Sequence, residues 1–398
     1  MRVTTSNSYD AAVANLQKRQ QNLQESQMQL TSLKRVTKAS DDPTAAARAE
    51  RALAVEARTS ASQRAVDASR SSMELSESVL GSAGELLQQA REALVSAGNA
   101  SYTDAERRGL AQTLRQLRTE LLSLANSPDG AGSFLFAGQG ASSPPFIDAV
   151  GGVQFQGVSG SAEAGSSEPL PLTFDGQATW LQARTGNGVF ETRATTQNGS
   201  AWIDGGRVSD PSAVTGDPYS ITFSVSGGTT TYTVLRNGNP TALTNVAYQA
   251  GQAIEIDGQS VTLSGTPANA DRFDLVPSTA TLSVFDALDR TAAALETAGR
   301  NSGQVAQSVA FGLRDVDQSM TRLQAQRSLA GETLNRIDRA GDRLSAQKLA
   351  AQTERSAAED LDMVEAISKV QEQQTGYDAA LKSYSSVQRL SLFQYLSV

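Results

Sequence analysis

A seven-residue repeat near the end of the chain is the feature that most constrains its fold. Eight consecutive positions at spacing seven carry apolar or small side chains: Val309, Val316, Leu323, Ala330, Ile337, Leu344, Ala351 and Ala358. Companion positions four residues later hold Leu313, Met320 and Leu334. A strict heptad keeps its apolar stripe against a partner only if the helices supercoil. The repeat therefore predicts a long coiled-coil helix within residues 281–398.

The first third of the chain carries a matching repeat. Its heptad positions are Val66, Met73, Leu80, Leu87 and Leu94, and a 4-3-4-3 pattern follows at Leu110, Leu114, Leu117, Leu121 and Leu124. The stretch from Gly98 to Thr103 predicts a break between two helices, and "NSPDGAG" (residues 126–132) predicts a stop. Since neither helical block can bury its stripe alone, we expect each to pair with the other or with a neighbouring chain.

In the middle of the chain the apolar residues change from a seven-residue spacing to an alternating pattern. In "YSITFSVSGGTTTYTV" apolar residues alternate on either side of Gly227-Gly228, and "AIEIDGQSVTL" repeats the pattern around Asp257-Gly258. Further turns are expected at Asn198-Gly199 and Asn237-Gly238, so residues of about 140–280 predict hairpins in a small β-sandwich or barrel. The predicted fold class is α+β: a long antiparallel helical bundle or coiled coil built from both chain ends, with a small inserted β domain. The expected domains are residues 1–42 with 360–398 (terminal helices), 43–135 with 281–359 (helical rod) and 136–280 (β domain).

Composition excludes several functions. The 398 residues carry a formal net charge of −8, whereas nucleic-acid binding needs a wide cationic surface, so no nucleic-acid partner is expected. The chain has no cysteine and no histidine, which excludes disulfides, thiolate or histidine catalysis and Cys/His metal sites. We expect no cofactor. The start lacks the apolar core of a secretory signal, and no run is apolar enough for membrane insertion. Residue chemistry alone therefore suggests a cytoplasmic protein.

Few residues could support catalysis. The carboxylate pairs Asp41-Asp42 and Glu359-Asp360 lie beside helix-start signals, where capping explains them better than acid–base chemistry. Trp180 and Trp202 could line a glycan site, but core packing is the favoured interpretation. No catalytic residue is predicted, and the chain is not expected to be an enzyme.

The outermost helices are expected to be too weakly apolar to fold alone. The first carries Leu16, Leu23 and Leu30 at spacing seven, but its companion positions are mostly polar. The last carries a ladder with spacings of three and four whose apolar members are Met363, Ile367, Val370, Tyr377, Leu381, Tyr384 and Tyr395, and the apolar ending includes Leu392. Because chain ends are usually polar, this pattern predicts burial in a larger assembly; an ordinary docked C-terminal helix is the alternative. We expect both ends to be sensitive to protease in the monomer.

The stretch "LKRVTKASDDPTAAARAE" (residues 33–50) predicts a joint. Lys34, Arg35 and Lys38 precede Asp41 and Asp42, and Pro43 follows as a favoured first helical residue. A first helix is expected to end near Val36, and a second to begin at Pro43 with Asp42 as its N-cap.

Three segments also resemble a known family. "RVTKASDDPTAAARAE" resembles the N-terminal signature of the bacterial flagellin family, "SFLFAGQGASSPPF" (residues 133–146) is similar to a stretch of its hook–filament junction branch, and residues 354–396 resemble that branch's C-terminal helix. The Ser-Leu-Phe-Gln-Tyr-Leu ending fits the junction branch better than major flagellins. Asp42-Pro43 departs from the Asp-Ala of many flagellins and is expected to start the helix more sharply.

The resemblance implies a structural function outside the cell, in the flagellum. Such proteins form a homo-oligomeric ring that joins another hook-associated protein to flagellin, after unfolded export through the flagellar type III system without a cleaved signal. A cytoplasmic export chaperone binds the C-terminal helix beforehand. The expected subunit interface holds Leu16, Leu23, Leu30, Lys34, Arg35, Lys38, Asp41 and Asp42, and the residues expected at both the interface and the chaperone are Met363, Ile367, Val370, Tyr377, Leu381, Tyr384, Leu392 and Tyr395. A major flagellin is the alternative within the family; a signalling coiled coil with a sensory β domain is a further alternative.

Overall fold

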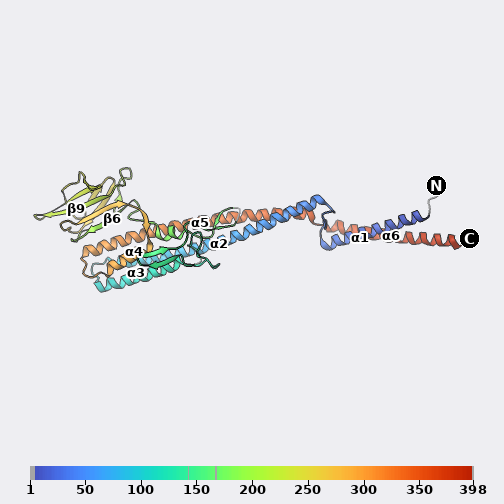
Figure 1. Cartoon of the computed structure of the whole chain (residues 1–398), viewed down its shortest axis with the longest axis horizontal. Coiled ribbons are helices and arrows are strands. Elements are labelled where there is room, and N and C mark those ends of the chain that lie inside the picture. The colour runs from blue at the N-terminus through green and yellow to red at the C-terminus, as the bar shows by residue number, and fades with distance from the viewer. Residues whose placement is uncertain (1–4, 142, 166–167, 397–398) are drawn as a thin grey trace. The chain divides into compact units, whose positions relative to one another are not determined.

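A computed structural model describes the backbone of residues 5–396, apart from residues 142 and 166–167, and the side chains of residues 10–386 with the same gaps. The α-helices are α1 (Thr5–Ser32), α2 (Pro43–Ala97), α3 (Asp104–Ala125), α4 (Val284–Glu296), α5 (Ser302–Glu359) and α6 (Met363–Leu396) (Figure 1), and a short π-helix, η1 (Gln177–Leu181), lies among the strands. All the strands lie between α3 and α4. This arrangement confirms the predicted α+β class. The chain forms two compact units, one containing residues up to Arg64 and from Gly341 onward, the other residues 65–340.

The heptad stripes of α2 and α5 are buried, as the sequence predicts. Val66, Met73, Leu80, Leu87 and Leu94 are at most 1% exposed, and Val309, Val316, Leu323, Ala330 and Ile337 are buried on α5. The helices run antiparallel, with ion pairs Arg91–Asp317 at 2.9 Å and Glu77–Arg327 at 2.6 Å along their length. These pairs are exposed and contribute about 0–1 kcal/mol each, so the buried stripe supplies most of the stabilisation. Leu344, further along the repeat, is only half-buried.

Two shorter helices complete a bundle with α2 and α5. Thr103 and Glu106 form a reciprocal capping box that starts α3, and Ser283 caps α4. The buried faces of α3 and α4 pack together, and Gly312 lets α5 approach both α4 and α2. A Cβ atom at Gly312 would lie 2.6 Å from Thr291 and 3.3 Å from Leu94. Helix α5 begins at Ser302 and continues through Gly312.

The segment from Ser133 to Arg184 packs on these helices through aromatic side chains. Phe136 meets Trp180 edge-on with ring centroids 5.3 Å apart, and Trp180 stacks on Phe285 of α4 at 6.0 Å. Trp180 is 1% exposed, which confirms the core interpretation for this residue. Small two-stranded sheets surround the cluster: β1 (Phe146–Ala149) with β2 (Gly152–Phe155), β3 (Glu163–Ala164) with β4 (Leu170–Pro171), and β5 (Ala183–Arg184) with β16 (Ala280–Leu282). The strand block that the sequence predicts over residues 136–280 thus contains two structures, and only the second is a sandwich.

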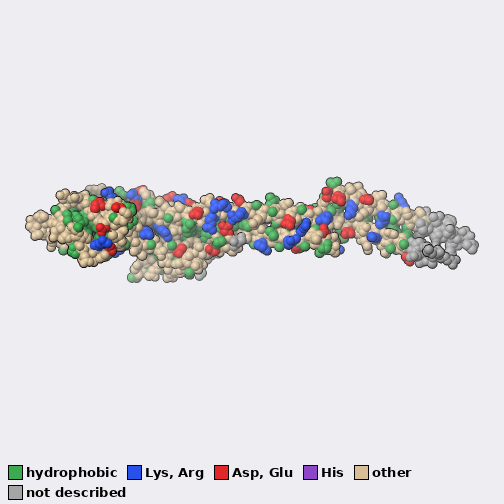
Figure 2. All heavy atoms as spheres, turned by 90° about the horizontal axis from the view of Figure 1, so that it is seen from above, with side chains coloured by type: hydrophobic (Ala, Val, Ile, Leu, Met, Phe, Trp, Pro, Cys, Tyr) green, Lys and Arg blue, Asp and Glu red, His purple; other side chains and the backbone are tan. Residues whose placement is uncertain are grey.

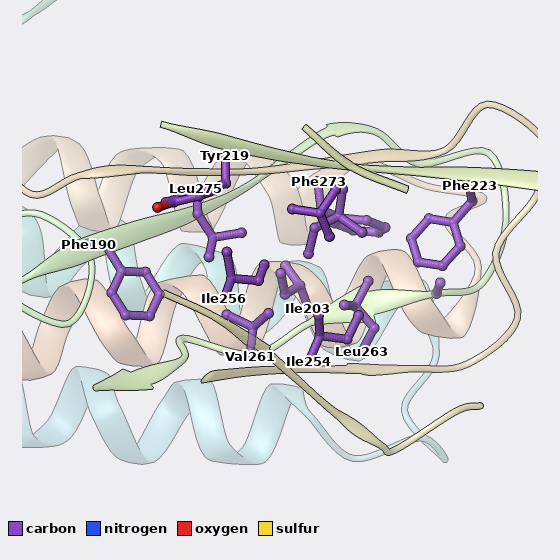
Figure 3. Close-up of a cluster of buried hydrophobic side chains, with 13 residues drawn as sticks. Phe190, Ile203, Tyr219, Phe223, Ile254, Ile256, Val261, Leu263, Phe273 and Leu275 are labelled. Atoms are coloured by element: carbon purple, nitrogen blue, oxygen red, sulfur yellow. The ribbon is translucent and has the colours of Figure 1, made fainter. Parts of the chain in front are cut away.

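The sandwich packs two antiparallel sheets face to face. One has the order β11-β10-β9-β15-β6, with β12 also paired to β10; the other has β13-β14-β7, with β8 paired to β14. The strands are β6 (Phe190–Thr196), β7 (Trp202–Ile203), β8 (Arg207–Val208), β9 (Tyr219–Ser226), β10 (Thr229–Arg236), β11 (Asn239–Pro240), β12 (Val246–Ala247), β13 (Ala253–Ile256), β14 (Gln259–Ser264) and β15 (Arg272–Pro277). Figure 3 shows side chains of both sheets meeting in one core, among them Phe273 and Val261. Both predicted hairpins are present, β9–β10 and β13–β14, and Asp257 and Gly258 have the positive φ angles (43° and 77°) that a two-residue turn requires.

A polar stripe on α5 attaches the sandwich. The side chain of Gln307, 3% exposed, accepts from the backbone N–H of Ile203 at 2.8 Å and donates to its carbonyl at 2.9 Å, as a neighbouring strand would. About two helical turns further along α5, Arg314 donates to the carbonyl of Thr192 at 2.8 Å. At the start of α5 a Cβ atom on Gly303 would lie 1.9 Å from the Ser200 carbonyl, so glycine permits the close approach. The sandwich and α5 are therefore held by directed hydrogen bonds.

Candidate assembly interface in the terminal helices

The connection between α1 and α2 is paired with the connection between α5 and α6. The backbone N–H of Arg35 donates to the carbonyl of Glu359 at 2.7 Å, and the N–H of Leu361 donates to the carbonyl of Leu33 at 3.1 Å. Lys34 and Asp360 form the antiparallel bridge between them. Leu33 adopts φ of 58°, which is uncommon for leucine. The two helical interruptions are thus one structure, which we call the paired joint (residues 33–42 and 359–362).

The aspartates of the joint stabilise it from within. Asp42 accepts from the N–H of Ala45 at 3.0 Å and from the hydroxyl of Thr44 at 2.7 Å, so it caps α2 as predicted, with Pro43 as first residue. These bonds, the Ala45 N–H first, lower the pKa of Asp42 to about 2. The N–H of Lys38 and the groups of Thr37 lower the pKa of Asp41. The first helix ends at Ser32, four residues before the predicted end, because the backbone turns there to pair with Glu359 and Leu361.

Two of the three cations are engaged within the chain. Lys34 pairs with Glu359 at 3.1 Å, and Arg35 pairs with Asp42 at 3.3 Å while donating to the Ala358 carbonyl at 2.8 Å. The ammonium group of Lys38 is exposed and contacts no acceptor among the described side chains. The sequence predicted that the charges of this stretch face neighbouring subunits; in the described structure Lys34 and Arg35 instead hold the joint, and the interface role of the stretch stays a prediction.

Helices α1 and α6 pack along each other, as Figure 1 shows. Leu16, Leu23 and Leu30 are half-buried on α1. The contact is partly polar, because the hydroxyl of Ser26, itself buried, donates to the side-chain oxygen of Gln373 at 2.8 Å. Among the described side chains of α6, Ala366 is the buried apolar one. Small and polar side chains therefore occupy positions where a dry seam would carry leucine.

The predicted ladder of α6 divides into two rows. Val370, Tyr377 and Tyr384 are half-buried. Met363, Ile367 and Leu381, which we call the exposed row, are 44%, 44% and 41% exposed. The side chains of Leu392 and Tyr395 lie outside the described part of the chain. The exposed row is thus left to solvent in this single chain, and the interface role expected for the ladder in the assembly stays a prediction.

On the face shown in Figure 2, basic and acidic side chains are intermixed over the helices and form no broad basic field. Within the described residues no helix is both long and apolar enough to cross a membrane. Nor do the described Asp and Glu side chains form a group of three that could hold a metal ion.

Family models match most of this architecture. The N-terminal helical region of bacterial flagellin matches residues 3–141, and the C-terminal helical region matches residues 313–396. Together these two regions cover more than half of the chain. The chain belongs to the bacterial flagellin family. Within this flagellin-family chain, residues 191–277 match the D2-like domain of flagellar hook-associated protein 1, which corresponds to the sandwich.

Individual relatives show which members of the family this chain is similar to. Flagellar hook-associated protein 3 of Salmonella typhimurium is 26% identical over 192 residues, which is 48% of this chain and 57% of that protein. The chain thus spans little more than half the length of the curated relatives it matches. Among solved structures, FlgL of Xanthomonas campestris has a TM-score of 0.69 and 27% identity over 77% of this chain and 99% of that one. The flagellar junction protein FlgL of Legionella pneumophila has a TM-score of 0.64 and 26% identity over 70% and 94%.

Proposed function

We propose that this chain is a structural subunit of the bacterial flagellum at the junction between hook and filament. The similarity to two FlgL structures over nearly their whole length carries the proposal, since one of them is described as a flagellar junction protein. The similarity to hook-associated protein 3 supports the same branch of the family. The ending Ser391 to Leu396 agrees with it.

Subunits associate through the terminal helices in this proposal. The exposed row of α6 and the side chain of Lys38 meet neighbouring copies in a homo-oligomeric ring, with another hook-associated protein on one side and flagellin on the other. Burial of apolar side chains drives the association. The paired joint sets where α1 and α6 leave α2 and α5. The sandwich faces outward.

Export precedes assembly. The chain passes unfolded through the flagellar type III channel and acts outside the cell, and a cytoplasmic export chaperone first holds α6, whose spacing of apolar residues suits a hydrophobic groove. Replacing Ile367, Tyr377 and Leu381 together by serine should abolish chaperone binding in calorimetry. Unchanged affinity would reject the chaperone part of the proposal and leave the junction part standing.

The chain has a structural role and no catalytic one in this account. Asp41 and Asp42 cap local backbone, and the Glu359-Asp360 pair lies in the paired joint. Robust turnover of any glycan by the purified chain would contradict this.

A major flagellin is the alternative within the family, and the comparisons do not favour it, because the relatives reported above are hook-associated protein 3 and FlgL. Deletion of the gene separates the two. Loss of a junction subunit should leave hooks without filaments and release polymerisable flagellin into the medium. Hooks that keep their cap with no flagellin released would favour the major flagellin instead.

A further inference from the structure

A cleft of about 430 Å³ lies at one end of the helical bundle. Its walls come from the turn between α2 and α3, from α3, from the start of α5, and from residues at β7 and directly after β14. Its volume is within the range of about 300–1,000 Å³ that small-molecule sites occupy. None of its described lining residues is acidic, although the chain as a whole is; the polar lining is Asn99, Arg107, Ser200, Trp202, Arg300 and Ser302.

Arg300 is an uncompensated charge in this cleft. It is half-buried, and one guanidinium nitrogen, Nη1, donates to the carbonyl of Ala294 at 3.1 Å and to the hydroxyl of Ser308 at 2.6 Å. No described carboxylate pairs with it, and burial lowers its pKa. Arg107 across the lining differs, because it pairs with Asp104 at 2.8 Å. Withdrawing an arginine from water without a counter-charge is unfavourable, so the site is suited to an incoming anion.

The rest of the lining indicates which kind of anion. A guanidinium matches a carboxylate through two parallel hydrogen bonds. Trp202 lies half-buried in the wall, unlike the fully buried Trp180, so part of its ring surface remains available. An indole face packs against the C–H face of a sugar ring, and the hydroxyls of Ser200 and Ser302 can exchange hydrogen bonds with sugar hydroxyls. A bare inorganic anion would use the arginine alone.

We propose that this cleft binds a carboxylate-bearing sugar of the uronic acid class. Its carboxylate pairs with Arg300, its ring lies against Trp202, and its hydroxyls contact the serine side chains. The site lies wholly within residues 65–340 and does not depend on the proposed junction function. Free uronate and the end of an acidic polysaccharide share this chemistry.

Titration of the purified full chain with glucuronate tests the site. The chain has two tryptophans and Trp180 is in the core, so a fluorescence change on binding reports Trp202. Arg300→Gln should weaken binding at least about tenfold, the effect of losing a charged hydrogen bond. Arg108→Gln is the matched control: it makes the same change of charge on an exposed residue of α3 outside the cleft, and should bind as the wild type does. Trp202→Phe should lose the fluorescence response.

Several outcomes would overturn the site. These are no saturation up to about 10 mM glucuronate, equal affinity for neutral glucose or for acetate, or equal weakening by Arg300→Gln and Arg108→Gln. Because Arg300→Gln could disturb the start of α5, circular dichroism checks its fold, and Arg300→Lys provides a second variant that keeps the charge. Arg300→Lys should bind more weakly than wild type, and unchanged affinity would refute the paired hydrogen bonds. An oligouronate binding more tightly than glucuronate would identify a polysaccharide end as the ligand, and equal affinity would identify the free sugar.

Discussion

Replacing Ile367 and Leu381 by serine should weaken assembly without unfolding the subunit. These residues are 44% and 41% exposed in the single chain, and among the side chains that the structure describes in α6 the buried apolar one is Ala366. Full burial of such a side chain is worth about 1.5–3 kcal/mol, so the part that assembly can still bury is worth about 0.6–1.3 kcal/mol for each. The pair then contributes about 1.2–2.6 kcal/mol per subunit, equivalent to roughly 8- to 80-fold in the association constant.

The assay compares bacteria that carry the variant gene with wild type. We expect fewer filaments per cell by electron microscopy and more unpolymerised flagellin in the medium, whereas circular dichroism of the purified variant should be unchanged. The control is Val225→Ser, which removes an apolar side chain that is 38% exposed on β9 of the sandwich and should leave filaments normal. Normal filaments from the α6 variant would refute the interface role of the exposed row. A variant that loses helix content as a monomer would show instead that the row stabilises the single chain.

Three further predictions concern the fold. Leu80→Ala should lower the free energy of unfolding by about 2–5 kcal/mol in urea titrations because Leu80 is 1% exposed, while Leu75→Ala, at 43% exposed, should change it by about 1 kcal/mol or less; equal effects would contradict the α2–α5 stripe. Gln307→Ala should leave the backbone N–H and C=O of Ile203 unpaired and speed hydrogen exchange at that amide. Unchanged exchange would contradict the claim that Gln307 attaches the sandwich to α5. The pKa of Asp42 is depressed to about 2, so its support of the joint is complete above about pH 4 and is lost as the pH falls toward 2; a carboxyl titration near pH 4 in NMR spectra would contradict the cap.

The sequence predicts those elements whose apolar residues recur at a regular spacing. The heptads of α2 and α5 and the hairpins around Gly227-Gly228 and Asp257-Gly258 have the structures expected, because burial of one face leaves little choice of register. The cap at Asp42 is equally local, because its carboxylate accepts from the backbone N–H of Ala45, three residues later.

Features that depend on polar contacts between distant residues could not be predicted in this way. Gln307 resembles a solvent-facing glutamine in sequence, yet it pairs with a strand about one hundred residues earlier. Helix α6 contacts α1 partly through the polar side chain of Gln373. The apolar pattern alone therefore could not predict which ladder residues are half-buried and which form the exposed row. The sequence favours a core position for Trp202, whereas the structure places it in the wall of a cleft. The neighbouring wall depends on the close approach of Gly303 to Ser200, which no apolar pattern in the sequence indicates. The aromatic cluster around Trp180 likewise forms from segments that share no period.

A map of the hook–filament junction by electron cryomicroscopy, taken from a strain that carries a tag within the sandwich, tests the central claim most directly. The account predicts one ring of this chain between hook and filament, with α1 and α6 forming the inner wall, the exposed row against neighbouring copies, and the tag on the outer surface. Density for the chain along the whole filament, or its absence from the junction, would contradict the account.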